Sequence, residues 1–261
     1  MEKEGLKKLR IVLITFLLLY AVNLVVPATG SLTYTQRLWA ICSAVIGLLA
    51  IVVLIREGVP CKSTIVIGVI LGLLAGLFRP ITGVITLLAF LASMRVMEGS
   101  DDKIEVVKRP YFTSIVIGVG TGVVLGVINL FLSGASLEFA PTLYAFALSL
   151  NPGISEEVVY RLFMYAFSIH LLGGKTGSRK EMAWVYVLMI VPHVLMHFPD
   201  TYFVNGSLQL DLGSLLIGPI ILGLVFGLPM TLALHKRDLT SAMIIHTVVD
   251  WIRFTFVGMP F

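Results

Sequence analysis

Residues 154–161 read ISEEVVYR and concentrate charge in a chain that otherwise avoids it. The segment holds two carboxylates and a guanidinium, on Glu156, Glu157 and Arg161, with apolar runs on both sides. Only 13% of all residues are charged. Ionisable groups in apolar surroundings persist where they pair with one another or face a wet cavity. The other polar groups of the chain therefore have to be considered as partners of this segment.

The composition is that of a polytopic membrane protein. Of 261 residues, 57% are hydrophobic, and the mean hydropathy is +0.98. Soluble domains are about 45–50% apolar and about 25% charged. Because each span must satisfy its own backbone hydrogen bonds in lipid, we interpret the apolar runs as helices. We expect an all-α transmembrane bundle of eight or nine spans in the cell membrane.

Several apolar runs are long enough to cross a bilayer. We predict spans at residues 9–27, 38–55, 114–132, 182–198, 214–234 and 239–257. A further helix ends at Leu172 and starts near Asn151 or earlier. Asn151 followed by Pro152 is a favourable start, with asparagine as the cap and proline in the first turn. The run at 9–27 is too long for a signal-peptide core, so we interpret it as a first span.

The stretch 64–96 is apolar but is interrupted by Arg79-Pro80, so one kinked span and a hairpin are both compatible with it. The basic residues favour the hairpin. Fifteen of the 19 lysines and arginines fall in segments that a hairpin places on one side: residues 1–10, 56–62, 95–109, 175–180 and 236–237. The positive-inside bias makes that side the cytoplasm. The N-terminus is then cytoplasmic.

The polar residues at membrane depth are confined to the C-terminal half. They form four groups: Glu156, Glu157 and Arg161; His193 and His197; His246 and Asp250; and Arg253. We therefore divide one integrated membrane domain into N-terminal helices without a catalytic motif, residues 1–113, and a catalytic core, residues 114–261. Composition gives no sign of nucleic-acid binding.

On a helix, Glu157 and Arg161 are four residues apart and are expected to pair. Glu156 is rotated by about 100° from Glu157 and has no basic residue three or four positions later. We expect one carboxylate to be neutralised locally and the other to be left free. A free carboxylate in a poorly solvated cavity suits a general base. An interfacial ion-pair cluster is the structural alternative.

The histidines are also spaced four apart, so His193 shares a face with His197, and His246 with Asp250. Such pairs bind metal or carry out acid–base chemistry. A lone membrane histidine more often packs and hydrogen-bonds, but two pairs beside a free glutamate favour a site. Arg253 is near a span end, and we interpret it as an interfacial anchor.

Two other features have structural explanations. The run GVGTGVVLGV at 118–127 lacks the lysine and hydroxyl of a phosphate loop, and close helix packing through small residues explains it. Cys42 and Cys61 are too few for a disulfide framework, and we expect two unpaired thiols.

The three polar motifs, in this order, resemble those of the CPBP family of intramembrane proteases, which includes the CaaX prenyl proteases of the Rce1 type. That family carries EExxxR, FxxxH, and HxxxN or HxxxD on transmembrane helices. Here the first motif is complete, and His246 with Asp250 gives the third in its Asp form. The second motif is PHVLMHFPD, which places His197 on the motif histidine and His193 where the family has phenylalanine. Leu162 stands where the family often has glycine. The resemblance covers about residues 140–257.

The resemblance implies an intramembrane endopeptidase of the glutamate type. Glu156 and His197 would activate a water, while His246 and Asp250 would stabilise the oxyanion. An ionised Asp250 cannot donate a hydrogen bond as the family's asparagine does, but it would hold His246 as an imidazolium. Glu157, Arg161 and His193 would support these four residues.

The resemblance also implies the partners and leaves alternatives. The expected partners are membrane lipid and a peptide or protein substrate, which in CaaX-type substrates is a prenylated C-terminus; no cofactor is implied. A metal-dependent hydrolase is one alternative, because His197, His246 and a glutamate could form a zinc set. A non-catalytic membrane protein for immunity, scaffolding or proton-coupled transport is the other.

Overall fold

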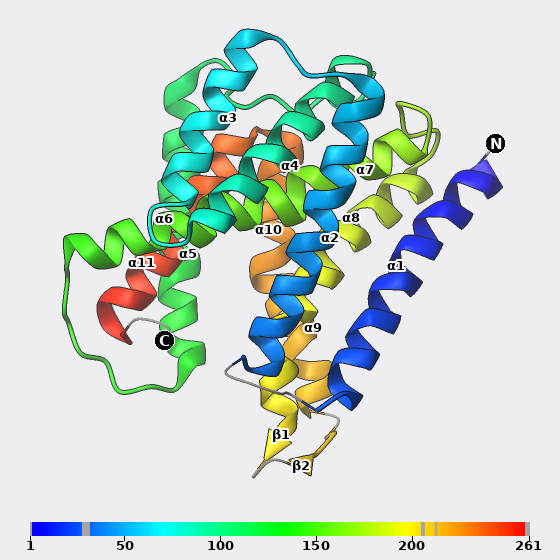
Figure 1. Ribbon diagram of the computed structural model, residues 1–261. Coiled ribbons are helices and arrows are strands. Elements are labelled where there is room, and N and C mark those ends of the chain that lie inside the picture. Colours follow the sequence, from blue (N-terminus) through cyan, green and yellow to red (C-terminus); the bar gives the residue numbers. More distant parts are fainter. Residues whose placement is uncertain (1, 28–31, 205–206, 212, 259–261) are drawn as a thin grey trace.

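The computed structural model describes residues 2–27, 32–204, 207–211 and 213–258 (Figure 1). The described chain is almost wholly helical, as the composition predicts. One short hairpin is formed by β1 (Phe203–Val204) and β2 (Ser207–Leu208), which pair antiparallel. Five segments of the described residues are long and apolar enough to cross a membrane: Glu4–Val25, Tyr34–Glu57, Pro80–Glu98, Tyr111–Ser133 and Leu215–Lys236.

The N-terminal half forms four helices: α1 (Glu2–Val25), α2 (Tyr34–Glu57), α3 (Lys62–Ala75) and α4 (Pro80–Glu98). The hairpin interpretation of 64–96 is confirmed, because α3 ends before Arg79-Pro80 and α4 begins with that proline. Proline suits the first position of a helix, where its missing N–H leaves no bond unmade. Gly72 and Gly76 lie against Gly83, so the two arms of the hairpin pack backbone to backbone.

The C-terminal half begins with α5 (Tyr111–Ser133), whose small residues pack against α11 (Leu239–Phe256). Gly118, Gly122 and Gly126 form a stripe along α5. A Cβ atom on any of them would lie within 2.7 Å of a side chain on α11. The glycine-rich run is therefore a helix-packing surface, as the sequence predicts.

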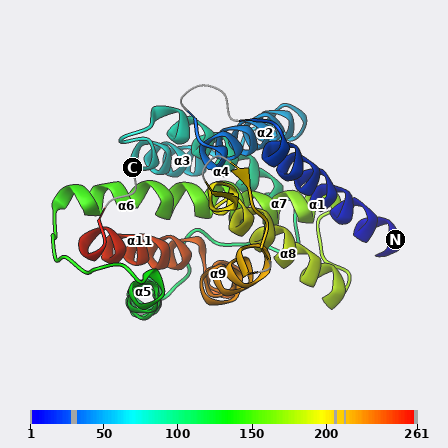
Figure 2. The same ribbon diagram turned by 90° about the horizontal axis from the view of Figure 1, so that it is seen from below.

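A single long helix follows, made of α6 (Leu143–Glu156), the π-helical turn η1 (Glu157–Leu162) and α7 (Phe163–Leu171). We call it the crossing helix, because it runs across the bundle (Figures 1 and 2). Of the two starts that the sequence left open, near Asn151 or earlier, the earlier one is observed. Thr142 caps the helix by accepting a hydrogen bond from the Ala145 N–H, and Pro152 lies inside it. Asn151 caps nothing here, because its side-chain amide donates to the carbonyl of Ala75.

The remaining elements return through the bundle. They are α8 (Arg179–Leu195), the 3₁₀ turn η2 (Pro199–Tyr202), the π turn η3 (Gly213–Ile217), α9 (Gly218–Leu222), the π turn η4 (Gly223–Gly227) and α10 (Leu228–Lys236), followed by α11. Asp238 caps α11 by accepting hydrogen bonds from the Ser241 N–H and hydroxyl. It also accepts one from the Lys108 N–H, which fixes the start of α11 to the loop before α5.

The predicted count of eight or nine spans is not established. The helices that carry the polar motifs, α6–α7, α8 and α11, are not among the five apolar candidates in the described residues. They are interrupted or short, or they carry several ionisable side chains. Polar side chains on these helices are tolerated in a membrane when the other helices separate them from lipid.

The two halves of the chain share one core. Buried residues of α1, α2 and α4, such as Leu9, Leu38 and Phe90, belong to the same apolar cluster as Val158 of η1 and Val185 of α8. α4 packs against η1 and α7, and α1 packs against α8. This packing agrees with one integrated membrane domain, while the division between residues 113 and 114 stays a prediction.

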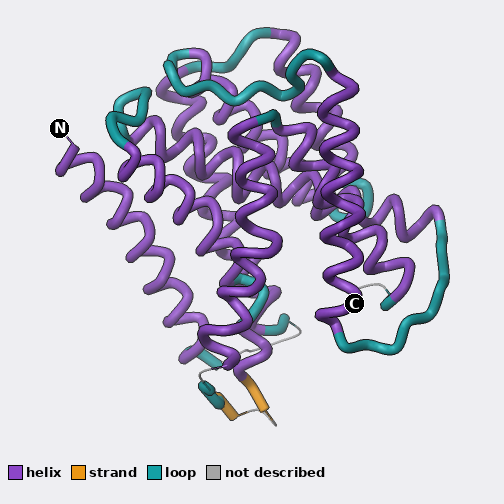
Figure 3. Tube along the Cα trace, turned by 180° about the vertical axis from the view of Figure 1, so that it is seen from behind, coloured by secondary structure: helices purple, strands orange, loops and turns teal. Residues whose placement is uncertain are grey.

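The loops with the basic residues gather at one end of the bundle. In Figures 1 and 3, the described start of the chain and the loops after α2, α4 and α7 lie opposite the β hairpin. The start of α11 joins them, because the Leu239 N–H donates to the carbonyl of Glu105. This arrangement is the one that the hairpin predicts. That this end faces the cytoplasm remains a prediction from the positive-inside bias.

Gly153 governs how closely the crossing helix approaches α11. A Cβ atom there would lie 2.9 Å from both the Cα and the N of Thr247, the neighbour of His246. We predict that Gly153→Ala lowers the free energy of unfolding by about 1–3 kcal/mol, as overpacking of a tight contact does. Thermal unfolding in detergent measures the effect.

Gly120→Ala is the matched control, because a Cβ atom at Gly120 meets nothing within 4 Å. Alanine is favoured over glycine in a helix by about 1 kcal/mol, so this variant should be neutral or slightly more stable. Equal stability of the two variants would show that the contact between Gly153 and Thr247 is not tight.

Candidate active site

A cavity of about 290 Å³ lies between the crossing helix, α8 and α11. Residues of α5 and of the segment α9–η4–α10 complete its wall. Its wall is unusually polar for a membrane bundle. The lining residues are Asn129, Arg161, His193, Val194, His197, Leu222, Phe226, Gly227, Met230, His246, Val249, Asp250 and Arg253. Except for Asn129 and Arg253, the polar members come from the three motifs, so tertiary packing brings these motifs to one place.

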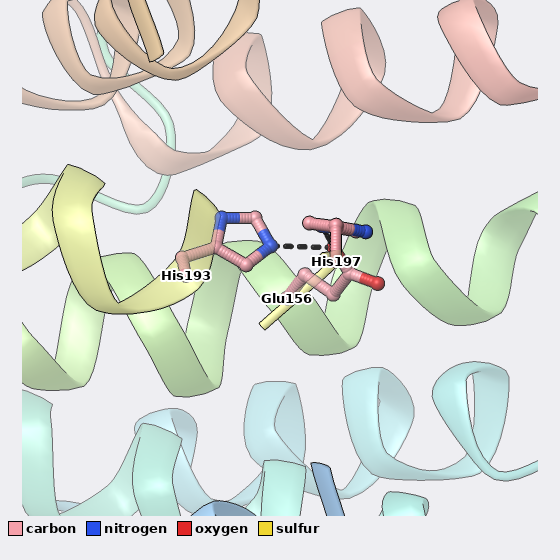
Figure 4. Close-up of side chains that lie close together, drawn as sticks. All are labelled: Glu156, His193 and His197. Atoms are coloured by element: carbon pink, nitrogen blue, oxygen red, sulfur yellow. Dashed lines mark hydrogen bonds and ion pairs between the residues drawn. The ribbon is translucent and has the colours of Figure 1, made fainter. Parts of the chain in front are cut away.

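Glu156 lies beside the imidazoles of three histidines. Its Oε2 atom is 2.6 Å from His193 Nε2, 3.6 Å from His246 Nε2 and 4.0 Å from His197 Nε2. Figure 4 shows Glu156 on the crossing helix, with His193 reaching it from α8 and His197 from the turn directly after α8. The carboxylate is only 14% exposed. A buried charge in this setting needs hydrogen bonds, and the His193 Nε2–H group supplies one.

The expectation that Glu156 is left free is wrong. Helical spacing correctly places no basic residue three or four positions after Glu156, but His193 approaches from α8. The expectation that Glu156 and Glu157 face different surroundings is also wrong, because both contact His246. The segment Glu157–Leu162 forms a π-helical turn, so the angle of an ideal α-helix does not apply there. π turns of this kind are frequent at functional sites.

Glu157 and Arg161 form the predicted ion pair. The guanidinium Nη1 donates to Glu157 Oε1, and the two side chains are 0% and 2% exposed. Taking two charges out of water costs several kcal/mol for each, and the pair persists because its geometry and further bonds offset that cost. Glu157 Oε1 also accepts a hydrogen bond of 2.7 Å from His246 Nδ1. Sequence spacing could not predict this second contact.

His246 is surrounded by carboxylates. Its Nδ1 faces Glu157, and its Nε2 lies 3.6 Å from Glu156 Oε2 and 3.5 Å from Asp250 Oδ2. The contact with Asp250 joins residues four apart on α11, as the sequence predicts. An imidazole with carboxylate oxygens beside both nitrogens is oriented on both sides.

His193 and His197 are one helical turn apart but occupy different surroundings. The His193 side chain is 4% exposed, bonds to Glu156, and stacks on the Tyr160 ring with 5.6 Å between ring centroids. The His197 side chain is 41% exposed. His197 therefore faces the open part of the site, while His193 is fixed within its wall.

An aromatic residue of the N-terminal half also contacts the histidines. The Trp39 ring of α2 meets Tyr160, His193 and His197 edge to face, with ring centroids 4.8, 5.7 and 5.3 Å apart. The Ser43 hydroxyl lies 2.5 Å from the Tyr160 hydroxyl. Sequence reasoning missed Trp39 because it lies in a segment without a polar motif. Its only signal is a large aromatic residue inside an otherwise aliphatic run.

Arg253 and Asn129 also line the cavity. Arg253 is exposed and lines the cavity. An interfacial anchor need not line a cavity, so this position is additional to the predicted anchoring role. Asn129 follows the glycine stripe of α5 by one turn. As an uncharged residue near a helix end, it gave no signal in the sequence.

Three side chains have the spacing of a metal site. Ligand atoms of Glu156, His193 and His197 lie within 4.8 Å of one another. Two imidazoles and a carboxylate are a ligand set that zinc accepts in hydrolases. The set differs from the one expected from sequence, because His193 takes the place of His246 in it. The same atoms can equally share hydrogen bonds without an ion.

The two cysteines take no part in the site. Cys42 is buried on α2, and Cys61 is exposed at the start of α3, so both are free thiols, as predicted.

Comparison with known proteins gives one match. A family model described as type II CAAX prenyl endopeptidase, Rce1-like, matches residues 138–252. This segment begins just before α6 and ends within α11, so it contains the crossing helix, both histidine pairs and Asp250. No curated protein and no solved structure matches the chain.

Glu156 and Glu157 share His246 as a neighbour but have different main partners, so their amide variants are expected to differ. Glu157→Gln leaves the buried Arg161 without its counter-charge, which costs about 3–5 kcal/mol of stability when one partner of a buried pair is removed. Glu156→Gln keeps an oxygen that can accept the His193 bond. We predict a clearly lower folded yield for Glu157→Gln, measured by size-exclusion chromatography and thermal unfolding. Equal folded yields would contradict a structural role for the ion pair.

Proposed function

We propose that the chain, whose residues 138–252 match the model of the Rce1-like family of type II CAAX prenyl endopeptidases, cleaves peptides in the membrane with a water activated by Glu156. The family is one of proteases, and the chain has several apolar helices of membrane-spanning length. The single observation that carries the mechanism is the position of Glu156, whose Oε2 has three imidazole nitrogens within 4.0 Å beside a cavity.

In this proposal, Glu156 and His197 hold the attacking water between them. Their facing atoms are 4.0 Å apart, which is too long for a direct hydrogen bond but allows one water to bond to both. Glu156 takes a proton from the water as its oxygen attacks the peptide carbonyl. His193 hydrogen-bonds the carboxylate and fixes the direction in which it points.

His246 stabilises the negative charge that forms on the carbonyl oxygen. Glu157 orients its Nδ1, and Asp250 helps to keep the ring as an imidazolium, so that Nε2–H points at the oxyanion. When the intermediate collapses, the C–N bond breaks and Glu156 returns its proton to the leaving amine. The products are a new carboxylate and a new amine, and the enzyme is unchanged.

The substrate we propose is a peptide C-terminus of the CaaX type, with a prenyl group on its cysteine. Support comes from the match to the family model. A second cavity, of about 340 Å³, is lined almost wholly by apolar side chains and shares Val194 with the first. A hydrocarbon chain attached near the scissile bond suits apolar surroundings of this kind.

The experiment is a cleavage assay in detergent with a panel of prenylated and plain peptides. We predict cleavage by the wild type and a loss of nearly all turnover in Glu156→Gln at matched folded yield. A non-catalytic scaffold or transporter should tolerate this near-isosteric change. Absence of cleavage across the panel, or full activity of Glu156→Gln, would contradict the proposal.

The metal alternative is tested in the same assay. A water activated by Glu156 needs no ion, so turnover should persist in the presence of a strong zinc chelator. Loss of turnover with chelator, and its recovery when zinc is added, would instead assign Glu156, His193 and His197 as metal ligands.

His193 and His197 are expected to differ in their effect on turnover. His197→Ala should lower turnover by at least about 10²-fold, as removal of an acid–base partner does. His193→Ala should lower it less, because its role is to orient Glu156. Turnover of both variants at matched folded yield is the measurement. An inactive His193→Ala beside an active His197→Ala would exchange the two assignments.

A further inference from the structure

The cavity wall holds two guanidinium groups, and only one of them is neutralised within the protein. Arg161 is paired with Glu157. The Arg253 guanidinium has no hydrogen bond, and no ion pair within 4.0 Å, with any residue of the described chain. The nearest carboxylate on its own helix, Asp250, acts on it only at longer range and lies 3.5 Å from His246. Arg253 thus presents unused donors and a positive charge to the cavity.

We propose that Arg253, together with the Asn129 amide, binds the C-terminal carboxylate of the peptide substrate and thereby selects which bond reaches Glu156. This inference rests on the proposed function and names the group of the substrate that the site recognises. A planar guanidinium binds a carboxylate through two parallel hydrogen bonds, and an amide N–H₂ group adds a neutral donor. Asn129 likewise has no hydrogen bond from its side chain to a described residue.

The position of Arg253 on α11 fits this role. Arg253 follows His246 by seven residues, which is almost two full turns, so both side chains leave the same face of the helix. Asp250 lies between them on that face, and all three line the cavity. Seven residues of α-helix correspond to about 10.5 Å along the axis.

This separation matches the length of a short peptide end. Three residues in extended form span at most about 10–11 Å. A carbonyl held at His246 and a terminal carboxylate held at Arg253 would therefore have about three residues between them. The site then acts as a ruler that places the scissile bond before the last three residues, which is where a CaaX sequence has its cysteine.

The packing of α5 on α11 places Asn129 within reach of the same group. Gly126 contacts Ile252, the residue directly before Arg253. Asn129 lies one turn further along α5. The two donors therefore belong to neighbouring positions across a close helix contact, and they reach the cavity from two helices.

The test compares two prenylated peptides that differ only at the C-terminus, one with a free acid and one with an amide. Binding is measured by fluorescence anisotropy to the Glu156→Gln variant, which is expected to fold and not to cleave. Cleavage is measured with the wild type. We predict that the acid is preferred by at least about tenfold in both measurements, since a lost charge-assisted bond costs roughly 1.5–3 kcal/mol.

Substitution at Arg253 should remove this preference. Arg253→Gln is made in the wild type and in Glu156→Gln. It should lower the affinity and the cleavage rate of the acid peptide to those of the amide peptide, and leave the values for the amide peptide unchanged. Arg253→Lys keeps the charge but loses the fork of donors, and it should retain part of the preference. Lys236→Gln is the matched control, because it removes one exposed positive charge that does not line the cavity.

Each outcome separates this inference from the proposed function. An Arg253-dependent preference in binding, without any cleavage by the wild type, would support the carboxylate site and contradict the protease. Cleavage with equal use of acid and amide would support the protease and overturn the carboxylate site. Equal losses for both peptides in Arg253→Gln would also overturn it and assign the residue to packing or to contact with lipid headgroups.

Discussion

The cost of burying charge in an apolar bundle is the constraint on which the rest of this structure depends. Glu156, Glu157 and Arg161 lie on one helix, and their charges are compensated only when His193 and His246 arrive from two others. These bonds form only when His193 and His246 lie level with the two glutamates. They therefore fix where α8 and α11 pack along the crossing helix. The close contact at Gly153 and the π turn after it are the local features through which the backbone meets that requirement.

The same constraint connects the architecture to the chemistry. Residues that neutralise one another completely cannot act on a substrate, and Glu157 with Arg161 comes closest to that state. Glu156 differs, because it is held by one hydrogen bond and faces two further imidazoles at longer distances. We therefore propose different roles for the two glutamates. The buried ion pair sets the geometry of the site, and the less constrained carboxylate of Glu156 moves the proton. The N-terminal helices contribute by surrounding the site, and Trp39 is their direct contact with it.

Sequence alone could predict what depends on local spacing or on bulk composition. The pairing of Glu157 with Arg161 and of His246 with Asp250 follows from their spacing of four residues. The hairpin at 64–96 follows from the distribution of basic residues. Hydropathy shows that the chain is helical and apolar, and the motifs locate the polar groups.

What could not be predicted depends on tertiary contact. The bond between His193 and Glu156 joins residues far apart in the chain. The π turn gives its side chains directions that differ from those that α-helical periodicity predicts. The start of α6 at Leu143 could not be fixed from sequence, because Asn151-Pro152 is equally compatible with a cap and with the interior of a helix. The number of spans remained open for a related reason. Helices that carry a polar site lose the hydropathy by which spans are recognised.

The measurement that tests the central claim most directly is a structure of Glu156→Gln in lipid with a bound peptide substrate. The account predicts the scissile carbonyl carbon within reach of a water held by residue 156 and His197, about 3–3.5 Å from that water. It also predicts the carbonyl oxygen at His246 Nε2. A peptide bound elsewhere on the bundle, or one whose scissile bond lies far from residue 156, would contradict the claim that these three helices converge to hydrolyse a peptide bond.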